Sequence, residues 1–239
     1  GRVITFGFNE GADVKISNFE NRSEPNSPDG SMRPFGISFK LEYGGSFIPI
    51  IIRNAFGRAQ ASAAAAATCV GLIFDLNLVE IAESVLKNYQ PAKGRMNLLP
   101  GIKESYLIDD AYNASPISMK EALETVFDLP GKRKIGVLGD MLELGKYSID
   151  AHEELGRSAV KVFDVLVTVG PRGKFIAASA AKAGFPRHKI LSFDTAGEAG
   201  KAVQTMIRKG DLILVKASRG IGLDKVVEEI KEIENALIV

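Results

Sequence analysis

Carboxylates follow two apolar runs in the middle of the chain, at the points where strands are predicted to end. Asp109 and Asp110 come after the run that ends at Ile108, and Asp140 comes after the run that ends at Leu138. The carboxyl ends of parallel strands lie at one edge of an open α/β sheet, which is where such sheets bind ligands. A carboxylate there can accept hydrogen bonds from the vicinal hydroxyls of a ribose, and we predict this role for Asp110. The competing role is a cap on the following turn or helix.

The loops after these strands carry further candidates. Asn113 follows Asp110 closely and either approaches a purine or stabilises a turn. Met141 lies between Asp140 and Glu143, and these two carboxylates either order their own loop or recognise an ammonium group.

A third polar segment follows the last apolar run of the chain. It contains Lys216, Ser218 and Arg219, just before a predicted helix. Two cations and a hydroxyl at the start of a helix suit a carboxylate or a phosphate group. The alternative is a solvated strand end followed by a helix start.

The residues beyond Tyr106 alternate between predicted strands and predicted helices. Connections of this length join parallel strands by right-handed crossovers, so we expect a doubly wound, Rossmann-like α/β domain. The predicted strands are 105–108, 134–138, 165–169, 189–192 and 212–215, and the predicted helices are 116–127, 149–163, 173–183, 195–209 and 223–233.

The first part of the chain has a different pattern. Residues 3–52 contain extended segments rich in β-branched and aromatic side chains, with a hairpin turn predicted at Gly44-Gly45. Residues 21–33 are rich in Ser, Pro, Asp and Asn, which predicts a surface loop. An Ala-rich helix is predicted over 54–74 and a second helix over 78–89. We therefore expect a small antiparallel β unit with helices.

Composition limits the possible functions. The chain has 30 basic and 29 acidic residues, so no overall field would attract nucleic acid. Its longest apolar run, 63–74, is too short to span a bilayer, and we expect no membrane insertion. The single cysteine, Cys69, excludes an intramolecular disulfide and suits a reducing, cytoplasmic location, with the thiol as a small core residue.

The polar segments, which read IDDAYNASP, GDMLELG and KASRG in order, resemble the C-terminal half of a Mur ligase. The likeness runs from about Gly1 to Ile230 and is closest to members that join D-alanyl-D-alanine to a UDP-muramoyl tripeptide. The resemblance implies ATP-driven amide formation through an acyl phosphate in bacterial peptidoglycan synthesis, with Mg²⁺. It also implies that 1–112 is the C-terminal part of a central ATP-binding domain and that 113–239 is the C-terminal ligase domain.

The resemblance implies two groups of site residues. Those expected to bind ATP are Asn54, Arg95, Asp110 and Asn113. Those expected to bind the other substrates are Asp140, Met141, Glu143, Lys216, Ser218 and Arg219. No metal ligand and no catalytic residue is assigned in this chain. Relatives often carry His-Asn where this chain has Arg53-Asn54, and K-G-S-R-G where it has K-A-S-R-G.

The phosphate-binding loop of this family, of the form G-x-x-G-K-[ST], does not occur in the chain. We therefore expect the chain to be the C-terminal portion of a longer ligase, to be inactive alone and to require the N-terminal part of the same protein. Two alternatives stay open: a folylpolyglutamate-type or other amino-acid ligase, and a non-catalytic α/β interaction module.

Overall fold

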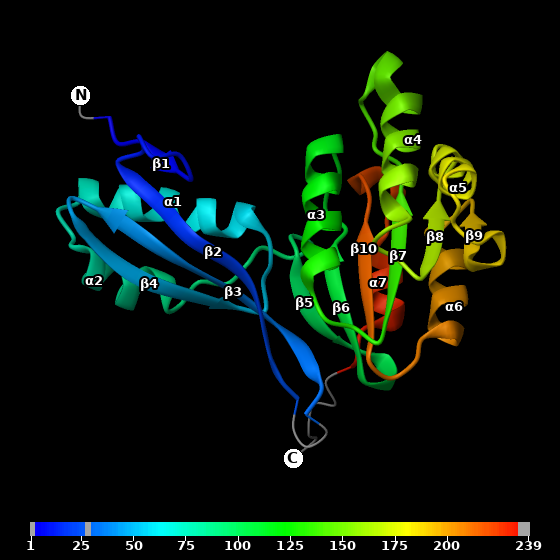
Figure 1. Ribbon diagram of the computed structural model, residues 1–239, viewed down its shortest axis with the longest axis horizontal. Coiled ribbons are helices and arrows are strands. Elements are labelled where there is room, and N and C mark those ends of the chain that lie inside the picture. Colours follow the sequence, from blue (N-terminus) through cyan, green and yellow to red (C-terminus); the bar gives the residue numbers. More distant parts are fainter. Residues whose placement is uncertain (1–2, 27–29, 234–239) are drawn as a thin grey trace. The chain divides into compact units, whose positions relative to one another are not determined.

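The computed structural model describes residues 3–26 and 30–233 (Figure 1). The chain divides into two compact units, Gly1–Ala92 and Lys93–Val239. Each unit has its own sheet.

The first unit contains a four-stranded sheet in the order β1-β2-β3-β4. Its longer strands are antiparallel, and β1 forms a short parallel pair with β2. Gly44 and Gly45 have φ of 57° and 81° and close the hairpin between β3 and β4, which confirms the predicted turn. The strands are β1 (Phe6–Gly7), β2 (Val14–Pro25), β3 (Met32–Tyr43) and β4 (Ser46–Arg53).

The expected surface loop over 21–33 was wrong for most of its described residues. The strands β2 and β3 continue into it, and Pro25 pairs with Met32 at the far end of the ladder. Residues 27–29 lie outside the described part of the chain. Main-chain pairing of two long strands, supported by the ion pair between Arg33 and Glu24, has overridden a composition that favours loops.

Small side chains let the Ala-rich helix α1 (Arg58–Ile73) pack along one face of this sheet (Figure 1). The helix begins later than predicted because Asn54 and Gly57 both have positive φ. A short helix α2 (Leu78–Ile81) follows and continues as a π-helix, Ala82–Leu86. Cys69 is buried and free, as expected for a core residue. The buried side chains of the unit include Val14, Ile16, Ile37, Phe39, Leu41, Ile50, Phe56, Ala61, Ala64 and Ala65.

The second unit contains a six-stranded sheet in the order β5-β6-β10-β7-β8-β9. All neighbours are parallel except β5, an edge strand that runs antiparallel to β6 and was not predicted. Because β5 and β6 pair into this sheet, the compact units divide N-terminal to the boundary expected after residue 112. The strands are β5 (Asn97–Gly101), β6 (Ser105–Asp110), β7 (Arg133–Gly139), β8 (Val165–Val169), β9 (Ile190–Phe193) and β10 (Asp211–Lys216).

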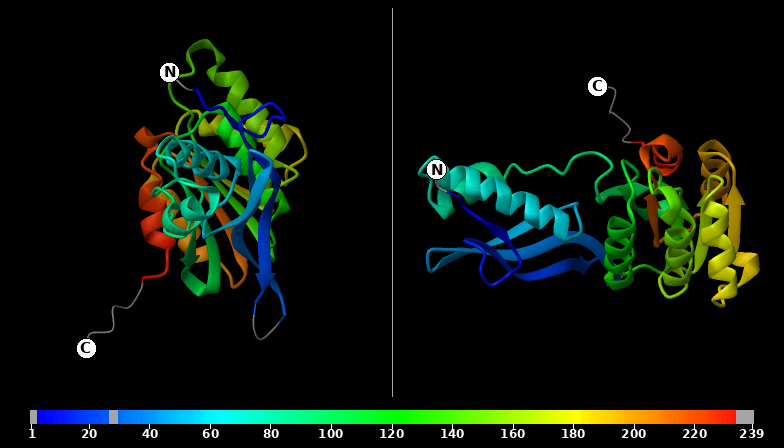
Figure 2. Two further views of the ribbon diagram at one scale, coloured as in Figure 1. Left: turned by 90° about the vertical axis from the view of Figure 1, so that its left-hand side faces the viewer. Right: turned by 90° about the horizontal axis from the view of Figure 1, so that it is seen from above.

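Helices cover both faces of the second sheet, as a doubly wound fold requires (Figure 2). One face carries α3 (Pro116–Asp128), α4 (Ser148–Ala159) and α5 (Gly173–Lys182), and the other carries α6 (Ala196–Met206) and α7 (Asp224–Ile230). The helix α3 begins where its sequence indicates, with Ser115 as N-cap and Pro116 in the first turn. None of the helices in the described part of the chain has the length and apolar character needed to span a bilayer.

Candidate functional site

The three polar segments of the second unit meet at the carboxyl edge of its sheet. Strand β10 lies between β6 and β7, and Lys216 is in register with Asp110 on one side and with Leu138 on the other. The strand ends therefore bring together residues that are about a hundred positions apart in the sequence. This convergence is what the sequence pattern predicted for a ligand site.

Lys216 and Asp110 form a buried ion pair at this edge. Lys216 Nζ lies 2.5 Å from Asp110 Oδ2 and also donates to the carbonyl oxygen of Asn113 at 3.1 Å. Asp110 Oδ1 accepts from the main-chain N–H of Met96 at 3.2 Å. Burial raises the pKa of the Asp110 carboxyl, and the charge of Lys216 opposes that shift. Lys216 was predicted to bind one of the other substrates, but its side chain contacts Asp110, which was predicted to bind ATP.

Tyr112 brings two cations together beside this pair. The guanidinium of Arg95 lies 4.3 Å from the centre of the Tyr112 ring and that of Arg219 lies 5.3 Å from it. All three side chains are exposed. The turn that carries Arg95 approaches Tyr112 closely, because a Cβ on Gly94 would lie 3.0 Å from Tyr112 Cβ and N. Both guanidinium groups therefore contact one ring at this edge of the sheet, and each exposed guanidinium suits an anion.

Asp140 has a different environment from Asp110. Its side chain is fully buried, and Oδ1 accepts from the main-chain N–H groups of Arg172 at 3.0 Å and Gly173 at 2.7 Å, at the start of α5. Oδ2 has no hydrogen-bond partner, with Arg172 Nη1 at 3.6 Å. The carboxylate thus stabilises the N-terminus of α5. Contact of Asp140 with a substrate stays a prediction.

The loop after β7 is held by two side chains. His152 Nε2 accepts from the N–H of Met141 at 2.9 Å, and Ser218 Oγ accepts from the N–H of Leu142 at 2.9 Å. Ser218 Oγ also donates to the carbonyl of Ala114 at 3.3 Å, which links this loop to the start of α3. Met141 and Ser218 are buried, whereas Glu143 is exposed, with φ of 64°.

Two contributors to this region were not predicted from the sequence. Met96 and Arg172 act through main-chain N–H groups. Every residue except proline has this donor, so no residue type marks the position. The glycine at position 94 was the available signal for a close turn, and it marks the turn that carries Met96.

Asn54 belongs to the first unit. It is exposed at the end of β4, has φ of 55° and donates its main-chain N–H to the carbonyl of Phe35 at 2.9 Å. The neighbouring Arg53 lies over the Phe35 ring, 4.4 Å from its centre. An adenine contact by Asn54 stays a prediction.

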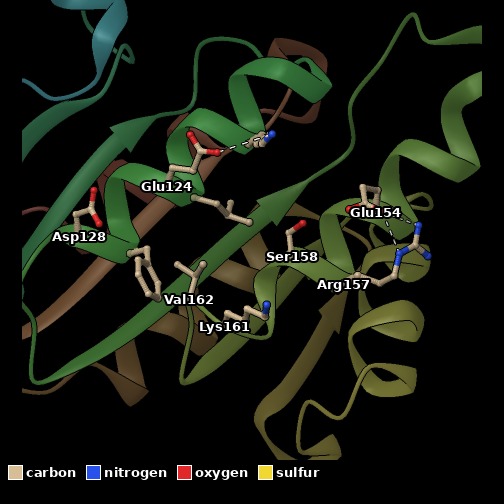
Figure 3. A pocket seen from close by; sticks show the side chains of 10 residues that line it. Glu124, Asp128, Glu154, Arg157, Ser158, Lys161 and Val162 are labelled. Atoms are coloured by element: carbon tan, nitrogen blue, oxygen red, sulfur yellow. Dashed lines mark hydrogen bonds and ion pairs between the residues drawn. The ribbon is translucent and has the colours of Figure 1, made fainter.

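A pocket of the second unit lies away from the strand ends. It is a pocket of about 700 Å³ between α3 and α4, and no predicted site residue lines it (Figure 3). A neighbouring pocket of about 380 Å³ includes Met141 among its walls. Within the described ranges, no group of three His, Cys, Asp or Glu side chains is arranged to hold a metal ion.

Comparison with known proteins identifies the family. Residues 94–219 match the family described as Mur ligase, glutamate ligase domain. The chain belongs to the Mur ligase family. A Bacillus subtilis Mur ligase, UDP-N-acetylmuramoyl-tripeptide–D-alanyl-D-alanine ligase, is 36% identical over 189 residues, which cover 78% of this chain and 40% of the relative.

Solved Mur ligase structures share the fold. The MurF ligase of Thermotoga maritima in complex with ADP matches with a TM-score of 0.73 and 26% identity, over 95% of this chain and 47% of that one. MurF from Acinetobacter baumannii matches with a TM-score of 0.77 and 28% identity, over 95% and 46%. The chain thus spans less than half the length of these relatives.

Proposed function

We propose that this chain is part of an ATP-dependent ligase that adds D-alanyl-D-alanine to a UDP-muramoyl tripeptide in peptidoglycan synthesis. The observation that carries this proposal is the convergence of Asp110, Arg95 and Arg219 at the sheet edge of a Mur ligase domain. The names of the relatives support the reaction, and the ADP in the Thermotoga maritima structure supports ATP use. Because ATP and a UDP-linked precursor are its substrates, we propose a cytoplasmic location.

In the proposed reaction, the tripeptide carboxylate takes the γ-phosphoryl group of ATP, and the amine of the dipeptide then displaces phosphate from the acyl phosphate. Asp110 has acceptor sites left for the ribose hydroxyls, since the Met96 N–H meets Oδ1, Lys216 meets Oδ2, and each oxygen can accept a second hydrogen bond. Exposed Arg95 suits the phosphate oxygens, and positive charge there stabilises the charge that develops during transfer. Asn54 and Asn113 are proposed at the adenine side.

We propose that the D-alanyl-D-alanine acceptor binds at the loops after β7 and β10. Glu143 and Arg219 are exposed there and can meet the ammonium and carboxylate groups of a dipeptide. Asp140, Met141 and Ser218 are buried, and we propose that they act by holding these loops in place. Among the described residues, no group of three His, Cys, Asp or Glu side chains could hold the Mg²⁺ of the proposed reaction.

We further propose that 1–112 and 113–239 work as parts of the central and C-terminal domains of the full-length ligase. The phosphate loop would come from the part of the relatives that this chain does not match. The test is a turnover assay with ATP, Mg²⁺, the UDP-muramoyl tripeptide and D-alanyl-D-alanine, on the 239-residue chain and on the full-length ligase. We expect activity only in the latter.

The same assay separates the alternatives. Activity of the isolated chain would overturn its proposed status as a part of the enzyme. Ligation by the full-length protein of glutamate or another amino acid, but not of the dipeptide, would instead favour a folylpolyglutamate-type or other amino-acid ligase. Absence of ligation with every acceptor, in a folded protein, would favour the interaction module.

The role of Asp110 has its own test. In the full-length ligase, Asp110→Ala should weaken ATP binding more than dipeptide binding, because hydrogen bonds to charged groups are worth roughly 1.5–3 kcal/mol. Calorimetric titration of both ligands gives the comparison. An unchanged ATP affinity would assign Asp110 to the structure of the turn.

A further inference from the structure

Lys216 is a buried cation at the ligand-binding edge of the second sheet. Its side chain is 2% exposed, whereas that of Asp110 is 8% exposed. Two of the three N–H donors of its ammonium group meet Asp110 Oδ2 and the Asn113 carbonyl. Lys216 is therefore almost completely enclosed, while the buried Asp110 side chain keeps a small exposed fraction at this edge.

The orientation of the Asp110 carboxylate depends on two contacts. Lys216 meets Oδ2 from the end of β10, and the Met96 N–H meets Oδ1 from the turn before β5. Each carboxylate oxygen can accept a second hydrogen bond. Without Lys216, the buried carboxylate would lose its cationic partner, and burial favours either a neutral carboxyl or a changed orientation.

We propose that Lys216 is a positioning residue, which holds the Asp110 carboxylate so that its remaining acceptor sites meet the ribose hydroxyls of ATP. The inference rests on the proposed function and refines it, because it assigns Lys216 to the nucleoside rather than to direct contact with the acceptor amine. Lys216 then acts on ATP only through Asp110. Removal of the Lys216 side chain should weaken the binding of nucleotides that have ribose hydroxyls. It should hardly change the binding of nucleotides that lack them.

The experiment compares ATP with 2′,3′-dideoxy-ATP in the full-length ligase by calorimetric titration. The wild-type protein should prefer ATP. Lys216→Met should weaken ATP binding about tenfold, as expected for a lost charged hydrogen bond, and should change binding of the dideoxy analogue less than about twofold. Lys120→Met is the matched control, because it removes an exposed cation from α3 and should leave both affinities unchanged.

A double-mutant cycle tests whether Lys216 acts through Asp110. Asp110→Asn should reduce the preference for ATP, and adding Lys216→Met to that variant should cause little further change. Lys216→Arg keeps a charged donor and should restore part of the preference. If Lys216→Met does not fold, Lys216→Gln, which keeps an N–H donor without the charge, replaces it in the same cycle.

The outcomes are distinct. If Lys216→Met loses equal affinity for ATP and for the dideoxy analogue, the positioning role of Lys216 is overturned. Additive losses of ATP affinity in the double variant would overturn it as well. In both cases the ribose contact of Asp110 would stand. A wild-type protein that binds both nucleotides equally would contradict the ribose contact itself and, with it, this inference.

Discussion

The imidazole of His152 accepts a hydrogen bond from the main-chain N–H of Met141 at 2.9 Å, so its Nε2 must carry no proton. Its Nδ1 lies 2.6 Å from the carbonyl oxygen of Ser148 and donates to it. Burial lowers the pKa of His152, and the charges of Asp140 and Arg172 act on it in opposite directions. The neutral ring therefore fastens the loop after β7 to α4.

This contact predicts a loss of stability in acid. Above the ordinary histidine pKa of 6.5, the ring is neutral in both the folded and the unfolded chain, and the contribution is complete. Below it, the unfolded chain takes up a proton that the folded chain resists, so stability falls by at most about 1.4 kcal/mol per pH unit until the folded pKa is reached. Urea unfolding of the chain at pH 7.5 and 5.5 measures the effect.

The control for this prediction is the second histidine. His152→Gln should reduce the difference in unfolding free energy between the two pH values. His188→Gln should leave it unchanged, because His188 is exposed. Identical pH dependence in wild type and His152→Gln would refute the prediction.

Asp140→Ala should destabilise the chain. The substitution leaves the N–H groups of Arg172 and Gly173 without their acceptor, at a cost of roughly 1–3 kcal/mol. Thermal or urea unfolding provides the measurement. The exposed Asp128 is the matched control, and Asp128→Ala should change stability little. An Asp140→Ala protein as stable as the wild type would contradict the capping role.

Gly94→Ala should destabilise more than Gly222→Ala, because the two glycines have nearly the same φ, 73° and 72°, and a Cβ at Gly222 meets only an ordinary contact at 3.7 Å. Both glycines have positive φ, so both substitutions strain the backbone. Only at position 94 does the added Cβ press on Tyr112, and this overpacking should add about 1 kcal/mol or more. The comparison of the two unfolding free energies isolates the contact. Equal losses would show that the Gly94 turn can move away from Tyr112.

Arg219→Ala should impair the use of the acceptor amine more than the binding of ATP. In the full-length ligase we expect a lower kcat or a higher KM for D-alanyl-D-alanine and a nearly unchanged ATP dissociation constant, because the exposed Arg219 is proposed to meet the carboxylate of the dipeptide. Arg95→Ala should instead weaken ATP binding. The exposed Arg187 serves as a control whose replacement should alter neither property.

Because Arg95 and Arg219 share the Tyr112 ring, the two variants must be compared directly. Equal losses of ATP affinity would place both arginines on the phosphates. Wild-type kinetics for Arg219→Ala would contradict a role of Arg219 in binding the dipeptide.

Local sequence pattern determined much of this protein. The alternation beyond Tyr106 predicted the parallel strands and their helices. Buried strands appear as short apolar runs and amphipathic helices as a helical period of apolar residues, and both patterns lie within a short stretch of sequence. The carboxylates at strand ends predicted the edge at which polar groups gather. The motifs identified the family, which the match over 94–219 confirms.

Tertiary structure decided what each polar side chain contacts. Nothing near Lys216 in the sequence indicates that its partner is Asp110, since the pair exists only because β10 lies beside β6 in that register. In the same way, Asp140 caps α5 because β7 and β8 are neighbours. Strand β5 escaped prediction because an edge strand is held by its partner rather than by a strong pattern of its own. Pairing across a sheet joins residues that are distant in the chain, and only the folded register determines which charges meet.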